Sequence, residues 1–193
     1  MIELIPETYV APLDPVAIFG RVAPLQVDLG CGDGSFLCEL ARSYPNKDFL
    51  GIEKLAGRVA KTCRKAAALD NVRVLHVETS YVVRYLLPPA SVETFYLLFP
   101  DPWPKRRHHR RRIVTTDFLD SIHRALEGGG SLHIATDQLD YFELIQRVGE
   151  NHLGFATDDV KDIDLPPTKF ERQFTSLGAS IYRLALRKIS PLR

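Results

Sequence analysis

The sequence predicts an α/β fold in which helices pack on a doubly wound, mostly parallel sheet. Three observations support this prediction. Short apolar segments alternate with longer amphipathic ones along most of the 193 residues, which is typical of successive strand–helix units. The glycine-rich stretch VDLGCGDG directly follows an apolar segment, as expected where a strand turns into a helix. Thr94–Phe99 is almost entirely apolar, which suits a strand buried on both faces.

The expected elements follow in order along the chain. Residues 1–24 contain Pro6, Pro12, Pro15 and Pro24, which predict an extended arm with a short helical piece at Val16–Phe19. Strands are expected at Leu25–Leu29, Asp48–Glu53, Val72–Val77, Thr94–Phe99 and Ser131–Thr136. Helices are expected from Asp33 or Gly34, at Lys54–Leu69, at Ser80–Leu87, from Thr115 or Thr116 through Leu126, and at Asp137–Gly149. One face of the first of these helices collects Phe36, Leu37, Leu40, Ala41 and Tyr44.

Glycines and polar residues shape the C-terminal part of the prediction. Gly128–Gly130 are expected to end the helix that precedes them. His152–Thr157 and Ala179–Arg187 are expected to be two strands that pair antiparallel, with the polar loop Asp162–Leu177 between them. Within that loop, Thr168 and Glu171 have the three-residue spacing that begins many helices.

Length and composition indicate one domain spanning residues 1–193, which buries roughly 70% of the surface that the unfolded chain exposes. No apolar stretch approaches the ~18 residues that span a bilayer, and the first residues, MIELIPETYV, lack the features of a secretory signal. Cys31, Cys38 and Cys63 have no metal-binding or redox spacing, so reduced thiols are expected. These features predict a cytoplasmic protein without a bound metal.

The stretch VDLGCGDG and the end of the next strand predict a nucleoside-binding site for a cationic ligand. The three glycines of the stretch are Gly30, Gly32 and Gly34. Their spacing differs from the G-x-G-x-x-G of dinucleotide binders, and the carboxylates of Asp28 and Asp33 would repel phosphate but suit a cation. Glu53 ends the second strand, where an acidic residue accepts from both ribose hydroxyls. A sulfonium, an amino group and a ribose diol together predict S-adenosylmethionine. The alternatives are that Asp28 caps a turn and that Glu53 is a helix N-terminal charge.

The segment FPDPWPKRRHHRRRIV, residues 99–114, predicts a nucleic-acid contact beside a rigid acidic turn. Three prolines stiffen the backbone and present Asp101 at the carboxyl end of a strand, where ligands of open α/β sheets bind. Six of the chain's 25 lysines and arginines lie in the next eight positions, so 19 remain against 24 acidic residues elsewhere. Such a local cationic cluster on an otherwise acidic protein attracts a polyanion. The alternative is a solvated loop.

With these motifs in the same order, the chain resembles the tRNA (guanine-N7-)-methyltransferases of the bacterial single-chain type. The resemblance begins at Phe19 and rests on FPDPWPKRRHHRRRIV, VDLGCGDG, FLGIEK, NVRVLHVE, SLHIATDQLDYFE and TKFERQ. It implies a Rossmann-like class I methyltransferase fold with a seven-stranded sheet whose C-terminal strand is antiparallel. It further implies S-adenosylmethionine as the methyl donor, the variable-loop guanine of tRNA as the acceptor, and a monomer or homodimer without an obligate protein partner.

The resemblance also implies roles for residues that match the family's motifs. The expected donor-binding residues are Asp28, Gly30, Gly32, Gly34, Glu53, Glu78 and Asp101. Asp101 is in addition the expected catalytic residue. The expected guanine- or tRNA-binding residues are Lys105, Asp137, Thr168, Lys169, Phe170 and Glu171. The expected phosphate contacts are Arg106, Arg107, Arg110, Arg111 and Arg112. The family more often has aspartate at position 78, alanine at 79 and glutamate at 28.

Several interpretations remain open at this point. Either Asp101 or Glu171 holds the guanine, Trp103 is a stacking platform or a core anchor, and Asp137 is a helix N-cap or an acceptor-site residue.

Methylation of an exocyclic amine is the first rival function, although those enzymes use a D-P-P-aromatic turn and this chain has D-P-W-P. A non-catalytic RNA-binding module and a small-molecule methyltransferase are the others. Intact donor motifs argue against the former, and the cationic cluster has no purpose in the latter.

Overall fold

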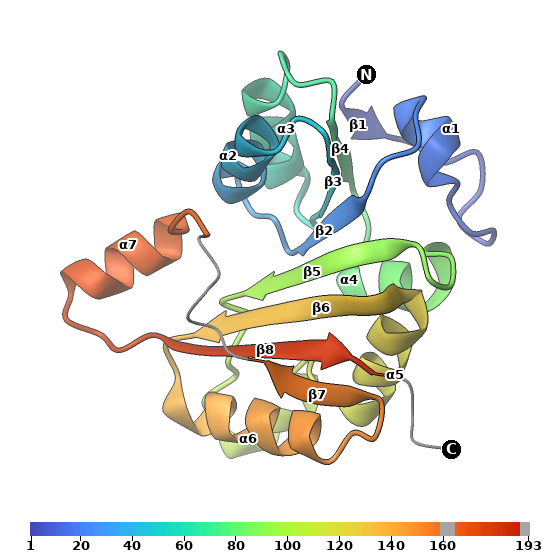
Figure 1. Cartoon of the computed structure of the whole chain (residues 1–193). Helices are drawn as coiled ribbons and strands as arrows, with labels where there is room; N and C mark the ends of the chain where they lie inside the picture. Colours follow the sequence, from blue (N-terminus) through green and yellow to red (C-terminus); the bar gives the residue numbers. More distant parts are fainter. Residues whose placement is uncertain (159–164, 190–193) are drawn as a thin grey trace.

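The computed structural model describes residues 1–158 and 165–189. Within them, eight strands form one sheet in the order β1-β4-β3-β2-β5-β6-β8-β7 (Figure 1). The strands are β1 (Glu3–Leu4), β2 (Leu25–Leu29), β3 (Asp48–Ile52), β4 (Val72–Leu75), β5 (Val92–Leu98), β6 (Leu126–Thr136), β7 (Phe155–Asp158) and β8 (Tyr182–Lys188). Only β8 runs antiparallel to its neighbours, β6 and β7. The predicted fold class, a mostly parallel sheet with an antiparallel C-terminal strand, is therefore confirmed.

Helices and helical turns connect these strands. They are α1 (Pro15–Phe19), α2 (Ser35–Ser43), α3 (Ala56–Lys65), α4 (Thr79–Tyr81), the π-helical turn η1 (Val82–Leu86), the 3₁₀ helix η2 (Arg106–Arg111), α5 (Thr116–Ala125), α6 (Leu139–Glu150) and α7 (Lys169–Ser176). Every helix in the described part of the chain falls short of the length and apolar character that a membrane crossing requires.

The order of the strands places a ligand-binding crevice at a predictable position. From β2 the sheet grows through β3 and β4 in one direction and through β5 and β6 in the other. The chain therefore reverses its direction of growth between β2 and β5, and ligands of open α/β sheets bind outside the carboxyl ends of the strands at such a point. The glycine turn follows β2 and the proline-rich turn follows β5, so both turns lie at this crevice.

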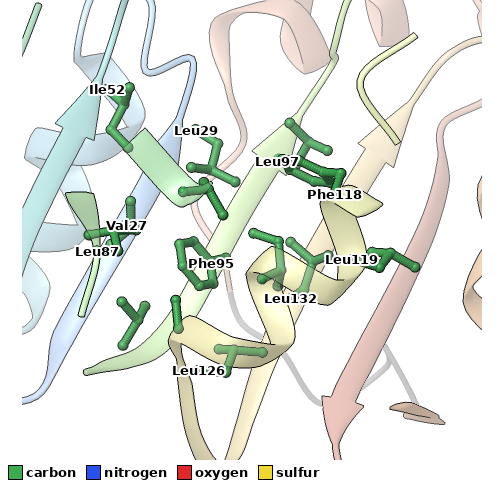
Figure 2. Close-up of a cluster of buried hydrophobic side chains, with 14 of the residues drawn as sticks. Val27, Leu29, Ile52, Leu87, Phe95, Leu97, Phe118, Leu119, Leu126 and Leu132 are labelled. Carbon is green, nitrogen blue, oxygen red and sulfur yellow. The ribbon is translucent and has the colours of Figure 1, made fainter. Parts of the chain in front are cut away.

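Buried side chains divide into two clusters because neighbouring residues of a strand point to opposite faces. Phe95 and Leu97 of β5 belong to the larger cluster, whereas Tyr96 between them belongs to the other. Figure 2 shows part of the larger cluster, in which Leu97 of β5 lies beside Phe118 of α5 and Val27 of β2 lies beside Leu87. The second cluster joins the sheet to the apolar faces of α2 and α3. This packing holds both functional turns on a buried sheet.

The structure differs from the predicted elements at several positions. The eighth strand, β1, comes from the extended arm, where the Ile2 carbonyl accepts the Val74 N–H at 2.9 Å. Tyr44, expected on the buried face of α2, is the residue after the helix and is 39% exposed. Gly128–Gly130 lie inside β6, at an irregularity in its pairing with β5, because α5 already ends at Ala125. The expected helix Ser80–Leu87 changes from α to π geometry at Val82.

The predicted polar loop Asp162–Leu177 is wrong in its second half. Residues 162–164 lie outside the described residues, and α7 occupies Lys169–Ser176. Thr168 caps this helix by accepting the Glu171 N–H at 3.0 Å, so the helix-start signal at these two residues is confirmed. In Figure 1, α7 stands beyond the carboxyl ends of β5 and β6.

Candidate active site

The glycine turn after β2 is held against the end of β3. The Ile52 carbonyl accepts N–H groups from Gly30 at 2.8 Å and Cys31 at 2.9 Å. Gly30 and Gly34 have φ angles of +83° and +74°, which side chains rarely tolerate. At Gly34 an added Cβ would also lie 2.5 Å from Cγ2 of Thr62. Both positions therefore favour glycine because of their positive φ angles. At Gly34, the contact with Thr62 also leaves no room for a side chain.

Glu53 links the glycine turn to the beginning of α3. Its side chain is buried at the end of β3, with Oε2 accepting the Gly32 N–H at 3.1 Å and Oε1 accepting the Leu55 N–H at 2.8 Å. Arg58 supplies a nearby positive charge, with Nη1 3.8 Å from Oε2. Both carboxylate oxygens are therefore fixed in direction at the mouth of the glycine turn.

Asp28 is the second buried carboxylate of this region. Burial, and then the nearby charge of Glu53, raise the pKa of Asp28 to about 7. Two buried carboxylates in one site disfavour ionisation of each other, and a cationic ligand would relieve that repulsion.

Asp33 does not share this character, contrary to the sequence-based interpretation. Its Oδ2 lies 2.8 Å from Nζ of Lys65, and its Oδ1 accepts from the backbone and hydroxyl of Ser35. Partial burial opposes ionisation, but the bonds from Lys65 and Ser35 outweigh it and lower the pKa of Asp33 to about 2. Because Lys65 compensates its charge, Asp33 is a loop-stabilising residue and adds little attraction for a cation.

The proline-rich turn after β5 is strained at both ends. Phe99 and Trp103 have φ angles of +55° and +45°, which are unfavourable for side chains of this size. The Phe99 N–H donates to the Ala135 carbonyl at 2.7 Å, which ties the turn to the neighbouring strand. Between the two strained residues, the Asp101 side chain is 70% exposed, with its Oδ2 3.9 Å from Nζ of Lys54.

One cleft of about 510 Å³ brings the predicted donor and acceptor elements together. Its walls include Gly30 and Glu53 from the glycine side and Asp101 from the proline-rich turn. Glu78 also lines the cleft, and its Oε2 accepts the Tyr81 N–H at 3.0 Å as the N-cap of α4. Residues separated by about 70 positions in the sequence thus share one concave surface at the crevice between β2 and β5.

Trp103 lies on the wall of this cleft and outside both buried clusters. The guanidinium carbon of Arg111 lies 4.9 Å from the centre of its ring, and His108 meets the ring edge-on at 5.8 Å. This position makes a core anchor the less suitable interpretation of Trp103 and leaves its ring beside the space where a ligand would lie.

The basic segment forms η2 and divides into exposed and buried arginines. Arg106, Arg107, Arg110 and Arg111 are exposed, and Arg110 and Arg111 line the cleft. Arg112 is only 5% exposed and its Nη2 lies 2.5 Å from Oδ2 of Asp140. Arg112 also lines the cleft, but its guanidinium is already buried and paired, which makes it less suited to a phosphate contact than its exposed neighbours.

The remaining predicted acceptor residues are not among those that line the cleft. Lys105 is exposed at the start of η2. Asp137 is half-buried and accepts from Nε2 of Gln138 at 2.7 Å, while Gln138 itself is the residue before α6, so the N-cap interpretation of Asp137 is wrong. Of the segment Thr168, Lys169, Phe170 and Glu171, the Phe170 ring approaches Phe99 at 6.3 Å, and Glu171 pairs with Arg183.

Sequence reasoning missed several cations around the cleft. Lys54 and Arg58 face Asp101 and Glu53, and Arg84 of η1 lines the wall beside α4. Lys54 and Arg58 follow Glu53 at the start of α3, so their proximity to the strand end was the available signal. No pattern in the sequence points to Arg84 or to the pairing of Arg183 with Glu171.

Comparisons with solved structures support the fold. The 16S rRNA methyltransferase KamB matches with a TM-score of 0.66 over 90% of this chain and 92% of its own, at 18% identity. The antibiotic-resistance methyltransferase Kmr matches with a TM-score of 0.62 over 96% and 95% of the two chains, at 17% identity. At these identities the likeness shows a shared fold and nothing finer.

Sequence comparisons show the family. Residues 22–184 match a family model described as "Putative methyltransferase". A tRNA (guanine-N(7)-)-methyltransferase of Halorhodospira halophila is 41% identical over 191 residues, covering 95% of this chain and 82% of the relative. One of Thermotoga maritima is 37% identical and covers 97% of this chain, which spans 61% of that relative. With its glycine turn, its acidic strand end and its proline-bounded aspartate gathered in one cleft, the chain belongs to the family of tRNA (guanine-N(7)-)-methyltransferases.

Proposed function

We propose that this protein transfers a methyl group from S-adenosylmethionine to N7 of a guanine in the variable loop of tRNA, forming N7-methylguanosine. The observation that supports this most directly is the shared cleft. It joins Gly30 of the glycine turn and the buried carboxylate of Glu53 to an exposed aspartate and to two exposed arginines. A cationic nucleoside suits the first part of the cleft, and a polyanion carrying a base suits the second.

The donor residues act by binding and orientation. When bound, S-adenosylmethionine supplies the electrophilic methyl group. Glu53 presents its carboxylate oxygens to the ribose hydroxyls, and Gly30 leaves room for the ligand beside the backbone. Asp28 attracts the positive charge of the donor once its own carboxyl is ionised. Glu78 follows β4, the neighbour of β3, and also lines the cleft, where it is assigned to the adenine.

The acceptor chemistry requires alignment rather than proton removal. Guanine N7 has a free lone pair and no proton, so no strong general base is needed at that atom. Alignment of N7 with the methyl carbon and sulfur supplies several kcal/mol by positioning alone. As the base gains positive charge, a carboxylate at its Watson–Crick edge stabilises that charge. Asp101 suits this task better than Glu171, because Glu171 is already paired with Arg183 whereas Asp101 is exposed within the cleft.

The exposed arginines of η2 provide the contact with tRNA. Arg106, Arg107, Arg110 and Arg111 point four guanidinium groups outward on one short helical segment, with Lys105 before them. Such groups position RNA through phosphates without reading its sequence. Trp103 offers an aromatic surface on which an unstacked base can rest beside Asp101.

Incubation of total tRNA with methyl-labelled donor, followed by nucleoside analysis, tests the proposed function. The expected product is N7-methylguanosine, a cation, located in the variable loop. An uncharged methylated nucleoside would favour the rival exocyclic-amine reaction, and RNA binding without turnover would favour a non-catalytic module. Methylation of small molecules with no effect of tRNA would overturn the proposal.

Removing two exposed arginines is expected to weaken tRNA binding in a salt-dependent way. In the double variant Arg106→Ala, Arg110→Ala, two phosphate contacts are lost. The slope of log affinity against log salt should therefore become shallower by about 1.4–1.8, at roughly 0.7–0.9 for each contact. The measurement is tRNA binding by fluorescence anisotropy across a salt series.

Arg42→Ala, Arg64→Ala is the matched control, because both of these arginines are exposed on α2 and α3 away from the cleft. It should retain the slope of the unmodified protein. If the η2 variant also retained that slope, the side chains of Arg106 and Arg110 would be exposed to solvent without contacting tRNA.

A further inference from the structure

Arg112 occupies a buried position that connects three parts of the fold. Its Nε donates to the Pro102 carbonyl at 2.8 Å, and its Nη2 donates to Oδ2 of Asp140 at 2.5 Å. Its guanidinium carbon also lies 4.7 Å from the centre of the Tyr141 ring, which is fully buried. One planar side chain therefore joins the proline-rich turn to the first turn of α6.

A buried guanidinium is costly to desolvate, so its retention in this conformation depends on these partners. Asp140 balances the charge and Tyr141 offers a ring face to the flat group. The third partner is a backbone carbonyl that lies between Asp101 and Trp103. Through this hydrogen bond Arg112 holds the backbone between Asp101 and Trp103, two residues that line the cleft.

The proline-rich turn is anchored at both ends. At its beginning, the Phe99 N–H bonds to Ala135, and the Phe99 ring packs 5.5 Å from that of Phe174. At its other end, the bond from Arg112 to Pro102 precedes the strained residue Trp103. Strained backbone persists only where its surroundings hold it. The Asp101 side chain is 70% exposed, so its location depends on the backbone of this turn.

We propose that Arg112 is a positioning residue for methyl transfer, setting the place of Asp101 and Trp103 through the Pro102 carbonyl, with Asp140 and Tyr141 holding its guanidinium. This proposal rests on the proposed function for the role of Asp101. It assigns different tasks to two neighbouring arginines that both line the cleft: Arg112 is buried and holds the backbone of the turn, whereas the side chain of Arg111 is exposed. Arg112 also ties the turn to the beginning of α6, close to Asp137.

Arg112→Lys tests the proposal while keeping the positive charge. Lysine lacks the planar fork that bonds Pro102 and Asp140 together, and it cannot stack flat on Tyr141. The expected result is about a tenfold fall in kcat, as for a small misplacement of a catalytic group. The KM for tRNA and the salt slope of binding should stay as in the unmodified protein, because no phosphate contact is lost.

Asp140→Asn is the second variant, chosen because the Asp140 side chain is 55% exposed and its replacement is compatible with folding. It should lower kcat in the same direction by a smaller factor, about threefold. The double variant should lose less than the product of the two factors, because both changes disturb one contact. Arg42→Lys, an exposed arginine on α2, is the matched control and should leave kcat unchanged.

Trp103 gives a readout that does not depend on activity. It is the only tryptophan among the 193 residues, so fluorescence excited selectively at tryptophan, and not at the seven tyrosines, reports this turn. In Arg112→Lys, acrylamide should quench this fluorescence more strongly at temperatures well below the thermal unfolding midpoint. If the unmodified protein failed to methylate tRNA, the proposed function would fall, and the quenching experiment would still decide whether Arg112 holds the turn.

Three results would overturn the positioning role. Unchanged kcat and unchanged quenching, with or without a lower unfolding midpoint, would leave Arg112 with a structural role only. In Arg112→Met, which removes the charge, a salt slope shallower by about 0.7–0.9 would mean that Arg112 contacts a phosphate after all. A raised KM for tRNA at constant kcat would likewise assign it to binding.

Discussion

Replacement of Asp101 by alanine is expected to lower the rate of tRNA methylation by about 10²–10³-fold, the loss seen when one preorganised electrostatic group is removed from an active site. The carboxylate lies on a rigid turn in the cleft, and the positive charge of the methylated base develops after tRNA is bound. The effect should therefore fall on kcat. The affinity for tRNA should change little, because the arginines of η2 are untouched.

Single-turnover methylation with saturating tRNA and donor measures this loss directly. Asp101→Asn separates charge from shape: it keeps the size of the side chain and a carbonyl acceptor, so it should recover part of the activity. Asp70→Ala, in the exposed turn after α3, is the matched control and should retain full activity. Near-normal turnover of Asp101→Ala would remove Asp101 from the chemistry and leave Glu171 as the remaining candidate.

The parallel part of the fold could be predicted because its signals are local. Apolar segments such as Thr94–Phe99 report burial on two faces, and the glycines of the first turn report backbone angles that other residues rarely adopt. Gly30, Glu53 and Asp101 line one cleft because parallel strands end on the same side of a sheet. The sequence therefore predicted that the turns after these strands would share one edge of the sheet.

Charge compensation could not be predicted, because it depends on partners far away in the chain. Within the basic segment every arginine looks alike, yet Arg112 is buried against Asp140, a residue 28 positions later. Asp33 and Glu171 were likewise predicted as free carboxylates, and Lys65 and Arg183 pair with them. Identity and spacing indicate that a charge is present, whereas only the folded chain determines whether that charge remains available.

The helix α7 shows a different limit of sequence reasoning. Its residues, KFERQFTS, are largely polar, and none of its side chains is buried, so no apolar pattern of core packing marks it. The Thr168 cap was the correct signal, but it was outweighed by the polar character of the surrounding segment. Contacts of Phe170 and Phe174 with Phe99 hold the helix near the cleft, and these contacts could not be inferred from a helix that lacks a buried face.

Replacement of Glu53 by alanine is expected to weaken donor binding by about 100-fold. The buried carboxylate accepts the Gly32 and Leu55 N–H groups and, in the proposed complex, the ribose hydroxyls. A hydrogen bond to a charged group contributes about 1.5–3 kcal/mol, so losing the ribose contacts accounts for a factor of this size. Isothermal calorimetry with S-adenosylmethionine measures the change. Glu39→Ala, an exposed glutamate on α2, should keep the normal affinity.

The pH dependence of donor binding provides an independent test of the same acidic pair. The pKa of Asp28 is raised to about 7, first by burial and then by the charge of Glu53. A cationic donor binds the ionised carboxyl more tightly, so its affinity should increase as pH rises towards and through about 7 and decrease at lower pH. In Glu53→Gln the smaller of the two causes is removed, so the pKa of Asp28 falls and the increase in affinity should begin at lower pH. If Glu53→Ala bound the donor normally, or if the pH profile of Glu53→Gln did not move, the two carboxylates would not form one donor site.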